Sequence, residues 1–118
     1  MFLNSLYTVR SIDQEEGVIM AEIRLDASHP IYRGHFPGMP VTPGVIQLEI
    51  VKEIMQQHLG RKLRLKNMRT CKFLQILNPE ETPVVNIGIK FTDGEFLEVM
   101  SSGSFKETVY FKAQSSYA

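Results

Sequence analysis

The sequence predicts an α+β fold in which one antiparallel sheet surrounds one long helix. Three observations lead to this prediction: two strand-like segments come first, a single convincing helix follows, and about four strand-like segments complete the chain. Runs of strands with one helix are typical of antiparallel α+β folds. The chain has 118 residues, which is the usual length of one packed unit, so we expect a single domain over residues 1–118.

Two strands are expected at the start of the chain. Residues 5–13 place Leu6, Val9 and Ile12 among polar neighbours, and residues 18–25 alternate apolar side chains with others. This alternation is typical of half-buried strands. The Glu16-Gly17 break between them predicts an antiparallel hairpin.

Residues 28–44 are expected to form a loop with many fixed backbone angles. They hold four prolines and three glycines in seventeen positions. Proline fixes one backbone angle, and both residue types are characteristic of turns. Binding and catalytic residues often lie on such loops.

Residues 45–59 are the predicted helix. Thr42 suits the N-cap, Pro43 suits the first helical position and Gly60 suits the C-terminal stop. At about 100° per residue, one broad arc is apolar: it holds Leu48, Ile50, Val51, Ile54, Met55 and Leu59. The opposite arc is polar and is expected to face solvent: it holds Lys52, Glu53, Gln56 and Gln57.

The rest of the chain is predicted to be strand, in hairpin succession. The expected strands are residues 63–74, 83–91, 95–105 and 108–113, with turns at Asp93-Gly94 and Lys106-Glu107. A sheet curled around one helix leaves its far side and edges uncovered, which favours a dimer.

Composition argues against several classes of function. Thirteen basic and thirteen acidic residues give zero net charge, so we expect no partner that is nucleic acid or membrane. A single cysteine, Cys71, excludes an intramolecular disulfide and multi-cysteine zinc sites. We expect Cys71 to be buried as a small apolar residue. The sequence shows neither a signal peptide nor a membrane-spanning run, so we expect a cytoplasmic protein.

Three features that suit proton transfer coincide between residues 34 and 49. His35 lies in the rigid loop, a helix is predicted to start at Pro43-Gly44, and Glu49 follows His35 by fourteen residues. Histidine exchanges protons near neutral pH, and free amides at a helix start can stabilise an oxyanion. Each feature alone also has a structural explanation. The residues alone therefore leave a proton-transfer site and a structural loop both open, and they name no substrate.

The run HFPGMPVTPGVIQLE, from His35 to Glu49, resembles the signature of the 3-hydroxyacyl-[acyl-carrier-protein] dehydratases of fatty acid synthesis. The match includes the fourteen-residue spacing between histidine and acid. Weaker similarity covers most of the chain. The resemblance implies the hot-dog fold, an antiparallel sheet wrapped around one long central helix, which pairs into dimers.

The resemblance also implies roles for single residues. His35 would be the base that removes the α-proton, and Glu49 of the other subunit would be the acid that helps water leave. The amide of Gly44 would polarise the thioester carbonyl, and the carbonyl of Val41 would orient the histidine ring. Two further residues would shape the pocket: Phe36 and Pro37.

The reaction implied by this resemblance is reversible dehydration to a trans-2-enoyl thioester, with no metal and no other cofactor. The implied partner is an acyl carrier protein that bears the substrate, and the implied assembly is a homodimer or a trimer of dimers. Glutamate as the acid resembles the branch that dehydrates without moving the double bond.

Two departures keep other functions open. Glu53 stands where the family usually has glutamine, and the family's longer N-terminal region has no counterpart. These departures favour one alternative, a non-catalytic subunit that binds acyl carriers, and the alternative enzyme is a hot-dog acyl-thioesterase. His29 and His58 lie outside the signature, and we expect both to be structural.

Overall fold

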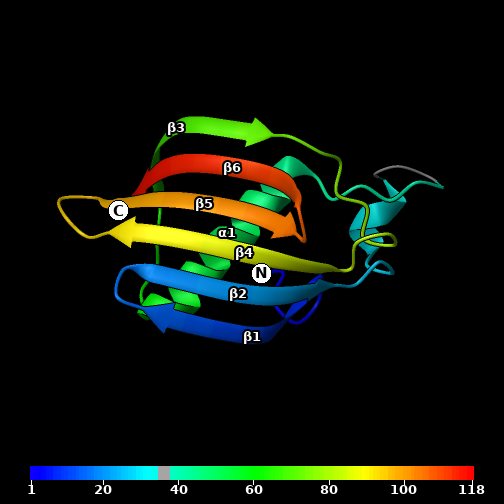
Figure 1. The fold of residues 1–118 in the computed structure, drawn as a ribbon, viewed down its shortest axis with the longest axis horizontal. Helices are drawn as coiled ribbons and strands as arrows, with labels where there is room; N and C mark the ends of the chain where they lie inside the picture. Colours follow the sequence, from blue (N-terminus) through cyan, green and yellow to red (C-terminus); the bar gives the residue numbers. More distant parts are fainter. Residues whose placement is uncertain (35–37) are drawn as a thin grey trace.

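The computed structural model describes residues 1–34 and 38–118, which form one sheet with a long helix behind it (Figure 1). The elements are β1 (Tyr7–Glu15), β2 (Val18–Leu25), the 3-10 helix η1 (Pro30–Arg33), α1 (Gly44–Leu59), β3 (Leu65–Phe73), β4 (Val84–Thr92), β5 (Leu97–Phe105) and β6 (Thr108–Tyr117). Every strand pairing in the described residues is antiparallel. The predicted α+β class is therefore confirmed, while η1 is an element that sequence patterns did not indicate.

The strands follow the order β1-β2-β4-β5-β6-β3 across the sheet. The predicted hairpins β1–β2, β4–β5 and β5–β6 are present. The prediction that β3 and β4 are also hairpin partners is wrong, because β3 pairs with β6 and β4 pairs with β2. Figure 1 shows the reason: α1 lies behind the sheet, and the segment that follows it, residues 60–64, leads the chain to β3 at the edge opposite β1.

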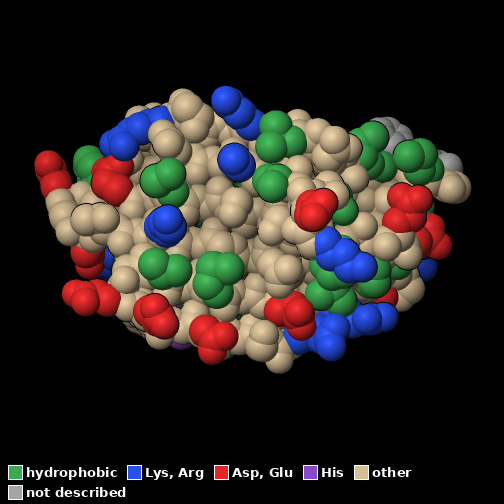
Figure 2. All heavy atoms as spheres, in the orientation of Figure 1, with side chains coloured by type: hydrophobic (Ala, Val, Ile, Leu, Met, Phe, Trp, Pro, Cys, Tyr) green, Lys and Arg blue, Asp and Glu red, His purple; other side chains and the backbone are tan. Residues whose placement is uncertain are grey.

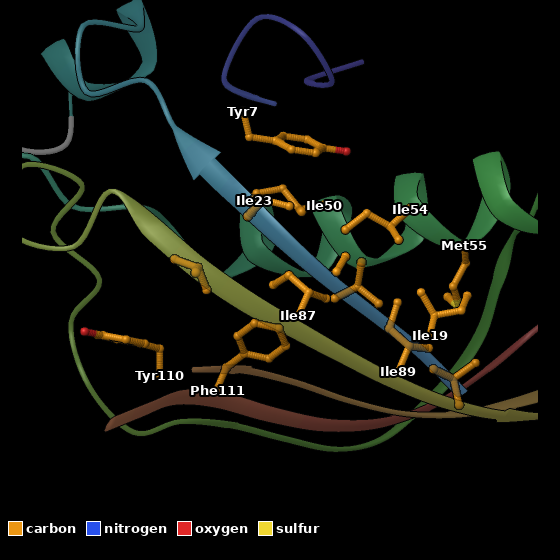
Figure 3. Packing of buried hydrophobic residues seen from close by; sticks show 14 of the residues in the cluster. Tyr7, Ile19, Ile23, Ile50, Ile54, Met55, Ile87, Ile89, Tyr110 and Phe111 are labelled. Carbon is orange, nitrogen blue, oxygen red and sulfur yellow. The ribbon is translucent and has the colours of Figure 1, made fainter. Parts of the chain in front are cut away.

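The core lies between α1 and the inner face of the sheet. Alternate residues of β2 and β4 point toward the helix, as their period-two burial shows. Figure 3 shows this packing for Ile19, Ile23, Ile50, Ile54, Met55, Ile87 and Ile89. All seven are at most 2% exposed, and each such side chain contributes about 1.5–3 kcal/mol to stability. The core therefore fixes how α1 lies on the sheet.

Helix α1 departs from the predicted pattern at its start and on its polar side. It begins at Gly44, with Pro43 as N-cap, while its predicted stop at Gly60 is confirmed by a left-handed φ of 67°. Glu53 is only 1% exposed, so the prediction that it faces solvent is wrong. The N-terminal segment of the chain covers this side of the helix and supplies its hydrogen-bond donors.

The edge strands β1 and β3 are mostly exposed. Cys71 lies on β3 and is partly buried rather than fully buried as predicted; this burial raises the pKa of its thiol. Figure 2 shows the outer face of the sheet, where apolar and charged side chains are interspersed. Within the described ranges, no helix is long and apolar enough to cross a membrane.

Candidate active site at the start of the long helix

The start of α1 has no side-chain cap. Pro43 occupies the N-cap position with extended backbone angles, and its carbonyl accepts hydrogen bonds from the amides of Ile46 and Gln47, both at 3.1 Å. The amides of Gly44 and Val45 come before these, so they have no acceptor within the helix. Together with the helix dipole they make the start of α1 a place where negative charge is stabilised.

Thr42 anchors the segment that leads into the helix. Its hydroxyl and the Tyr32 hydroxyl lie 2.9 Å apart, and its amide donates to the carbonyl of Leu77 at 2.9 Å. Its own carbonyl accepts from the side-chain amide of Gln47 at 3.0 Å. The prediction that Thr42 caps the helix is wrong, because its buried hydroxyl is already used in a tertiary contact with Tyr32.

Phe73 lies against the first residue of the helix. A β-carbon built on Gly44 would come within 2.4 Å of Cζ of the Phe73 ring. Only glycine allows this close approach without a shift of the ring. The ring is 50% exposed, so it forms an apolar wall at the helix start that is open on one side. Sequence reasoning missed Phe73, and its only signal was the glycine opposite it.

Gln47 brings an open hydrogen-bond acceptor close to this site. The residue is 5% exposed, and its Oε1 is buried without a donor among the described residues. A buried polar atom without a partner is rare and is often explained by a water molecule or a ligand. Sequence reasoning included Gln47 in the signature but gave it no role.

The two carboxylates on α1, one turn apart, have different surroundings. Glu49 is partly buried, and its negative charge helps to raise the pKa values of Tyr7 and Tyr117, in both cases less than burial does. Glu53 is buried and accepts a hydrogen bond from the Tyr7 hydroxyl at 3.1 Å. Glu49 is therefore the more accessible of the two carboxylates.

Glu49 and Gly44 lie at different positions around the helix and more than one turn apart. Five residues separate them, which corresponds to about 7.5 Å along the axis and about 140° around it. The side chain of Glu49 is therefore offset from the helix start both along the axis and around it.

The structure describes three of the six predicted site residues. Gly44 and the partly buried Val41 lie at the helix start, and Glu49 lies more than one turn further along. The other three predictions lie outside the described residues: His35, Phe36 and Pro37. His29 has a structural role, since its Nδ1 accepts a hydrogen bond from the amide of Ile31 at 3.1 Å and caps η1.

Comparisons with curated proteins point to dehydratases. The chain is 28% identical over 81 residues to the 3-hydroxyacyl-[acyl-carrier-protein] dehydratase FabZ of Chloroflexus aggregans, which is 62% of this chain and 56% of that protein. It is 25% identical over 117 residues to the protein of the same name in Desulforamulus reducens, covering 92% and 82% of the two chains. The chain thus spans little more than half the length of the Chloroflexus protein.

A solved structure confirms the hot-dog fold. A chain of the dehydratase heterocomplex ApeI:P from Xenorhabdus doucetiae matches with a TM-score of 0.77 and 20% identity, over 94% of this chain and 96% of that one. In addition, residues 11–109 match the family described as ApeI-like, ApeI dehydratase. Since this match covers most of the 118 residues, the chain belongs to the ApeI-like family of dehydratases.

Proposed function

We propose that this protein dehydrates a 3-hydroxyacyl thioester, carried by an acyl carrier protein, to the trans-2-enoyl thioester. The observation that carries the proposal is the uncapped start of α1 at Gly44, within the segment that resembles the dehydratase signature. This end of the helix can bind the thioester carbonyl oxygen. The family match supports the class of reaction.

In the proposed reaction, His35 removes the α-proton of the substrate as the α C–H bond breaks. Negative charge then develops on the thioester oxygen, where the amide of Gly44 donates a hydrogen bond. Glu49 of the partner subunit gives a proton to the 3-hydroxyl group as the C–O bond breaks, and water leaves. Proton exchange with solvent restores both side chains. No cofactor takes part in these steps.

We infer that a second copy of the chain completes the site. The outer edge of β3 has no strand partner among the described residues, since β3 pairs only with β6. Large apolar side chains near this edge and the helix start are about half exposed or more: Met39, Val45, Phe73, Leu74 and Ile76. An unpaired edge with an apolar border favours association with another chain.

Mixing two inactive variants tests the shared site. Glu49→Gln and His35→Ala are each expected to abolish turnover, whereas mixed dimers keep one intact site. A one-to-one mixture after subunit exchange should recover about a quarter of wild-type activity. No recovery, in mixtures shown by native mass measurement to contain the mixed dimer, would place both residues of a site in one subunit. If the chain forms no dimer with itself, its partner is expected to be a related second protein. The similar Xenorhabdus chain is part of a heterocomplex.

The activity itself is tested with purified protein and 3-hydroxyacyl carrier thioesters of increasing chain length. The expected result is growth of the absorbance of the conjugated enoyl thioester, which His35→Ala prevents. Release of free thiol, detected with a thiol reagent, would instead indicate the thioesterase alternative. Saturable binding of acyl carrier without either product, with the partner subunit present, would indicate a non-catalytic binding subunit.

A further inference from the structure

Glu53 is a buried carboxylate that the proposed reaction does not use. It is 1% exposed, and it accepts hydrogen bonds from the backbone amide of Phe2 at 2.9 and 3.1 Å and from that of Leu3 at 2.9 Å. The Tyr7 hydroxyl donates to the same carboxylate at 3.1 Å. Three donor groups from the first seven residues of the chain therefore converge on one side chain of α1.

These first residues form a compact turn rather than a trailing end. The carbonyl of Phe2 accepts hydrogen bonds from the amides of Ser5, Leu6 and Tyr7, at 2.9–3.3 Å. Leu6 and Tyr7 are 0% and 1% exposed. The carbonyl of Leu6 in turn accepts from the amide of Asp26 at 2.7 Å. The turn is thus tied to α1 on one side and to the chain after β2 on the other.

The same turn contacts the segment that leads to His35. The ring of Phe2 lies edge-on to the ring of His29, with centroids 6.3 Å apart and planes at 71°. The Nδ1 atom of His29 accepts the amide hydrogen of Ile31, which starts η1. Tyr32 of η1 then contacts Thr42 at the helix start. A continuous series of contacts therefore runs from Glu53 through Phe2 and His29 to η1, and from Tyr32 of η1 to Thr42 before the start of α1.

We propose that Glu53 is a positioning residue: through the N-terminal turn and His29 it sets the placement of η1, and through the contact of Tyr32 with Thr42 it sets the placement of the start of α1. The effect on catalysis rests on the proposed function, whereas the effect on η1 does not. Contiguous packed contacts of this kind can transmit placement between segments, and small displacements of a reacting group strongly reduce turnover.

The surroundings of position 53 also explain why this chain departs from the family resemblance. A carboxylate accepts hydrogen bonds at both oxygens and has no hydrogen to donate. A glutamine in the same place would turn an NH2 group toward one or more of these three donors. The carboxylate is thus matched to backbone amides of Phe2 and Leu3. It is not placed as a second acid for the substrate, since its oxygens are occupied by donors of its own chain.

The test compares Phe2→Ala and Glu53→Gln with Ile89→Val, a buried core variant on β4 whose strand partners are Ile19 and Ser101. Two quantities are measured in the full-length protein: hydrogen exchange at the amides of Ile31 and Tyr32, and kcat and KM separately. Phe2→Ala leaves the backbone donors of Glu53 in place and removes only the ring that packs on His29 and borders the core, so we expect it to fold even where Glu53→Gln does not. It should raise exchange at these amides and lower kcat about tenfold, with KM within about twofold.

The exchange rates and kcat of Phe2→Ala and Ile89→Val decide whether Glu53 has the positioning role. Faster exchange at η1 in Phe2→Ala, but not in Ile89→Val, supports the positioning role even if the wild-type protein produces no enoyl thioester, in which case only the proposed function fails. Wild-type exchange and wild-type kcat in folded Phe2→Ala would overturn the proposal. An equal rise in exchange across the whole chain, in this variant and in Ile89→Val alike, would also overturn it, because it would indicate general destabilisation.

Discussion

The two ends of α1 are built in opposite ways. At the C-terminal end, Gly60 takes a left-handed conformation and its amide donates to the carbonyl of Gln56 at 3.0 Å. The Gln56 side chain then accepts a hydrogen bond from the amide of Leu63 at 2.9 Å. At the N-terminal end, Pro43 provides no side-chain cap, and glycine follows it at the first helical position.

We infer from this difference that the C-terminal end of α1 serves stability, whereas the open N-terminal end is the candidate place for a ligand. Capping groups at a helix end stabilise it by about 1 kcal/mol, and the C-terminal end makes such contacts within the chain. The N-terminal end leaves its first amides without a partner in the helix and places a glycine below the ring of Phe73. Helix N-termini with free amide groups are suited to bind anionic groups.

The largest expected effect comes from Glu49→Gln. If the N-terminal end of α1 binds only the carbonyl oxygen of the thioester, a separate acid must protonate the leaving hydroxyl group. Glutamine cannot supply that proton. Loss of such an acid lowers kcat by about 10²- to 10⁴-fold, measured as enoyl thioester formation. Urea unfolding should change by less than about 0.5 kcal/mol, because the residue is only partly buried.

Glu49→Asp is the control, since it keeps an acid at this position. It should retain more activity than Glu49→Gln. Equal and nearly full activity in both variants would remove Glu49 from the reaction and leave the open end without its acid.

The second effect is expected for Gly44→Ala. The new methyl carbon would lie 2.4 Å from Cζ of Phe73, so the ring must move. The moved ring and the methyl group then partly cover the first amide of the helix. We expect kcat/KM to fall about ten- to a hundredfold. Thermal unfolding should show little loss, because alanine is favoured over glycine in helices by up to about 1 kcal/mol.

The double variant Gly44→Ala, Phe73→Leu separates the two causes. Partial recovery of activity would assign the loss to the displaced ring, and no recovery would assign it to the covered amide. Full activity in Gly44→Ala itself would show that nothing approaches the helix start closely.

The sequence predicted the stop of α1 at Gly60 but not the residue at its N-cap, and the reason is physical. The stop at Gly60 depends on a local property, because glycine adopts a left-handed conformation without strain. A cap by Thr42 would also have depended only on neighbouring residues of the chain. Instead, the Thr42 hydroxyl is hydrogen-bonded to the hydroxyl of Tyr32, ten residues away in the chain. A single sequence contains no signal for such a tertiary partner.

The same distinction applies to the fold and the site. Alternation within β2 and β4 predicted the buried face of the sheet, since it depends on neighbours along one strand. The pairing of β3 with β6 and the burial of Glu53 depend on contacts between distant segments. The sequence-based predictions at these two places, a β3–β4 hairpin and an exposed Glu53, were therefore wrong. The signature indicated the segment that leads into α1 as the candidate site, but it held no signal for the ring of Phe73 that lies against Gly44.

A third, smaller effect is expected for Tyr32→Phe, which removes the contact that anchors the open end. Loss of the hydrogen bond to Thr42 should cost about 1–2 kcal/mol near pH 8, measured by urea unfolding. Burial raises the pKa of Tyr32 above its usual value of 10.0, although the bond to Thr42 opposes this rise. The phenol therefore contributes its full stability below about pH 10, and the contribution is lost as the pH rises further.

The stability difference between wild type and Tyr32→Phe should accordingly shrink above about pH 10, by at most about 1.4 kcal/mol per pH unit. Thr42→Val removes the other half of the same hydrogen bond. The double variant should lose less than the sum of the two single variants. Additive losses would mean that Tyr32 and Thr42 stabilise the protein independently.

The smallest effect tests the closed end of the helix. Gly60→Ala should lower the free energy of unfolding by about 1 kcal/mol, because alanine is strained at a φ of 67° while no atom of the described residues lies within 4 Å of its new methyl group. Gly60→Asn should lose less, since asparagine tolerates this conformation. In both variants kcat should equal that of wild type when measured well below the melting temperature. A fall in kcat comparable to that of Gly44→Ala would contradict the division of roles, because it would mean that the C-terminal end also controls the reaction.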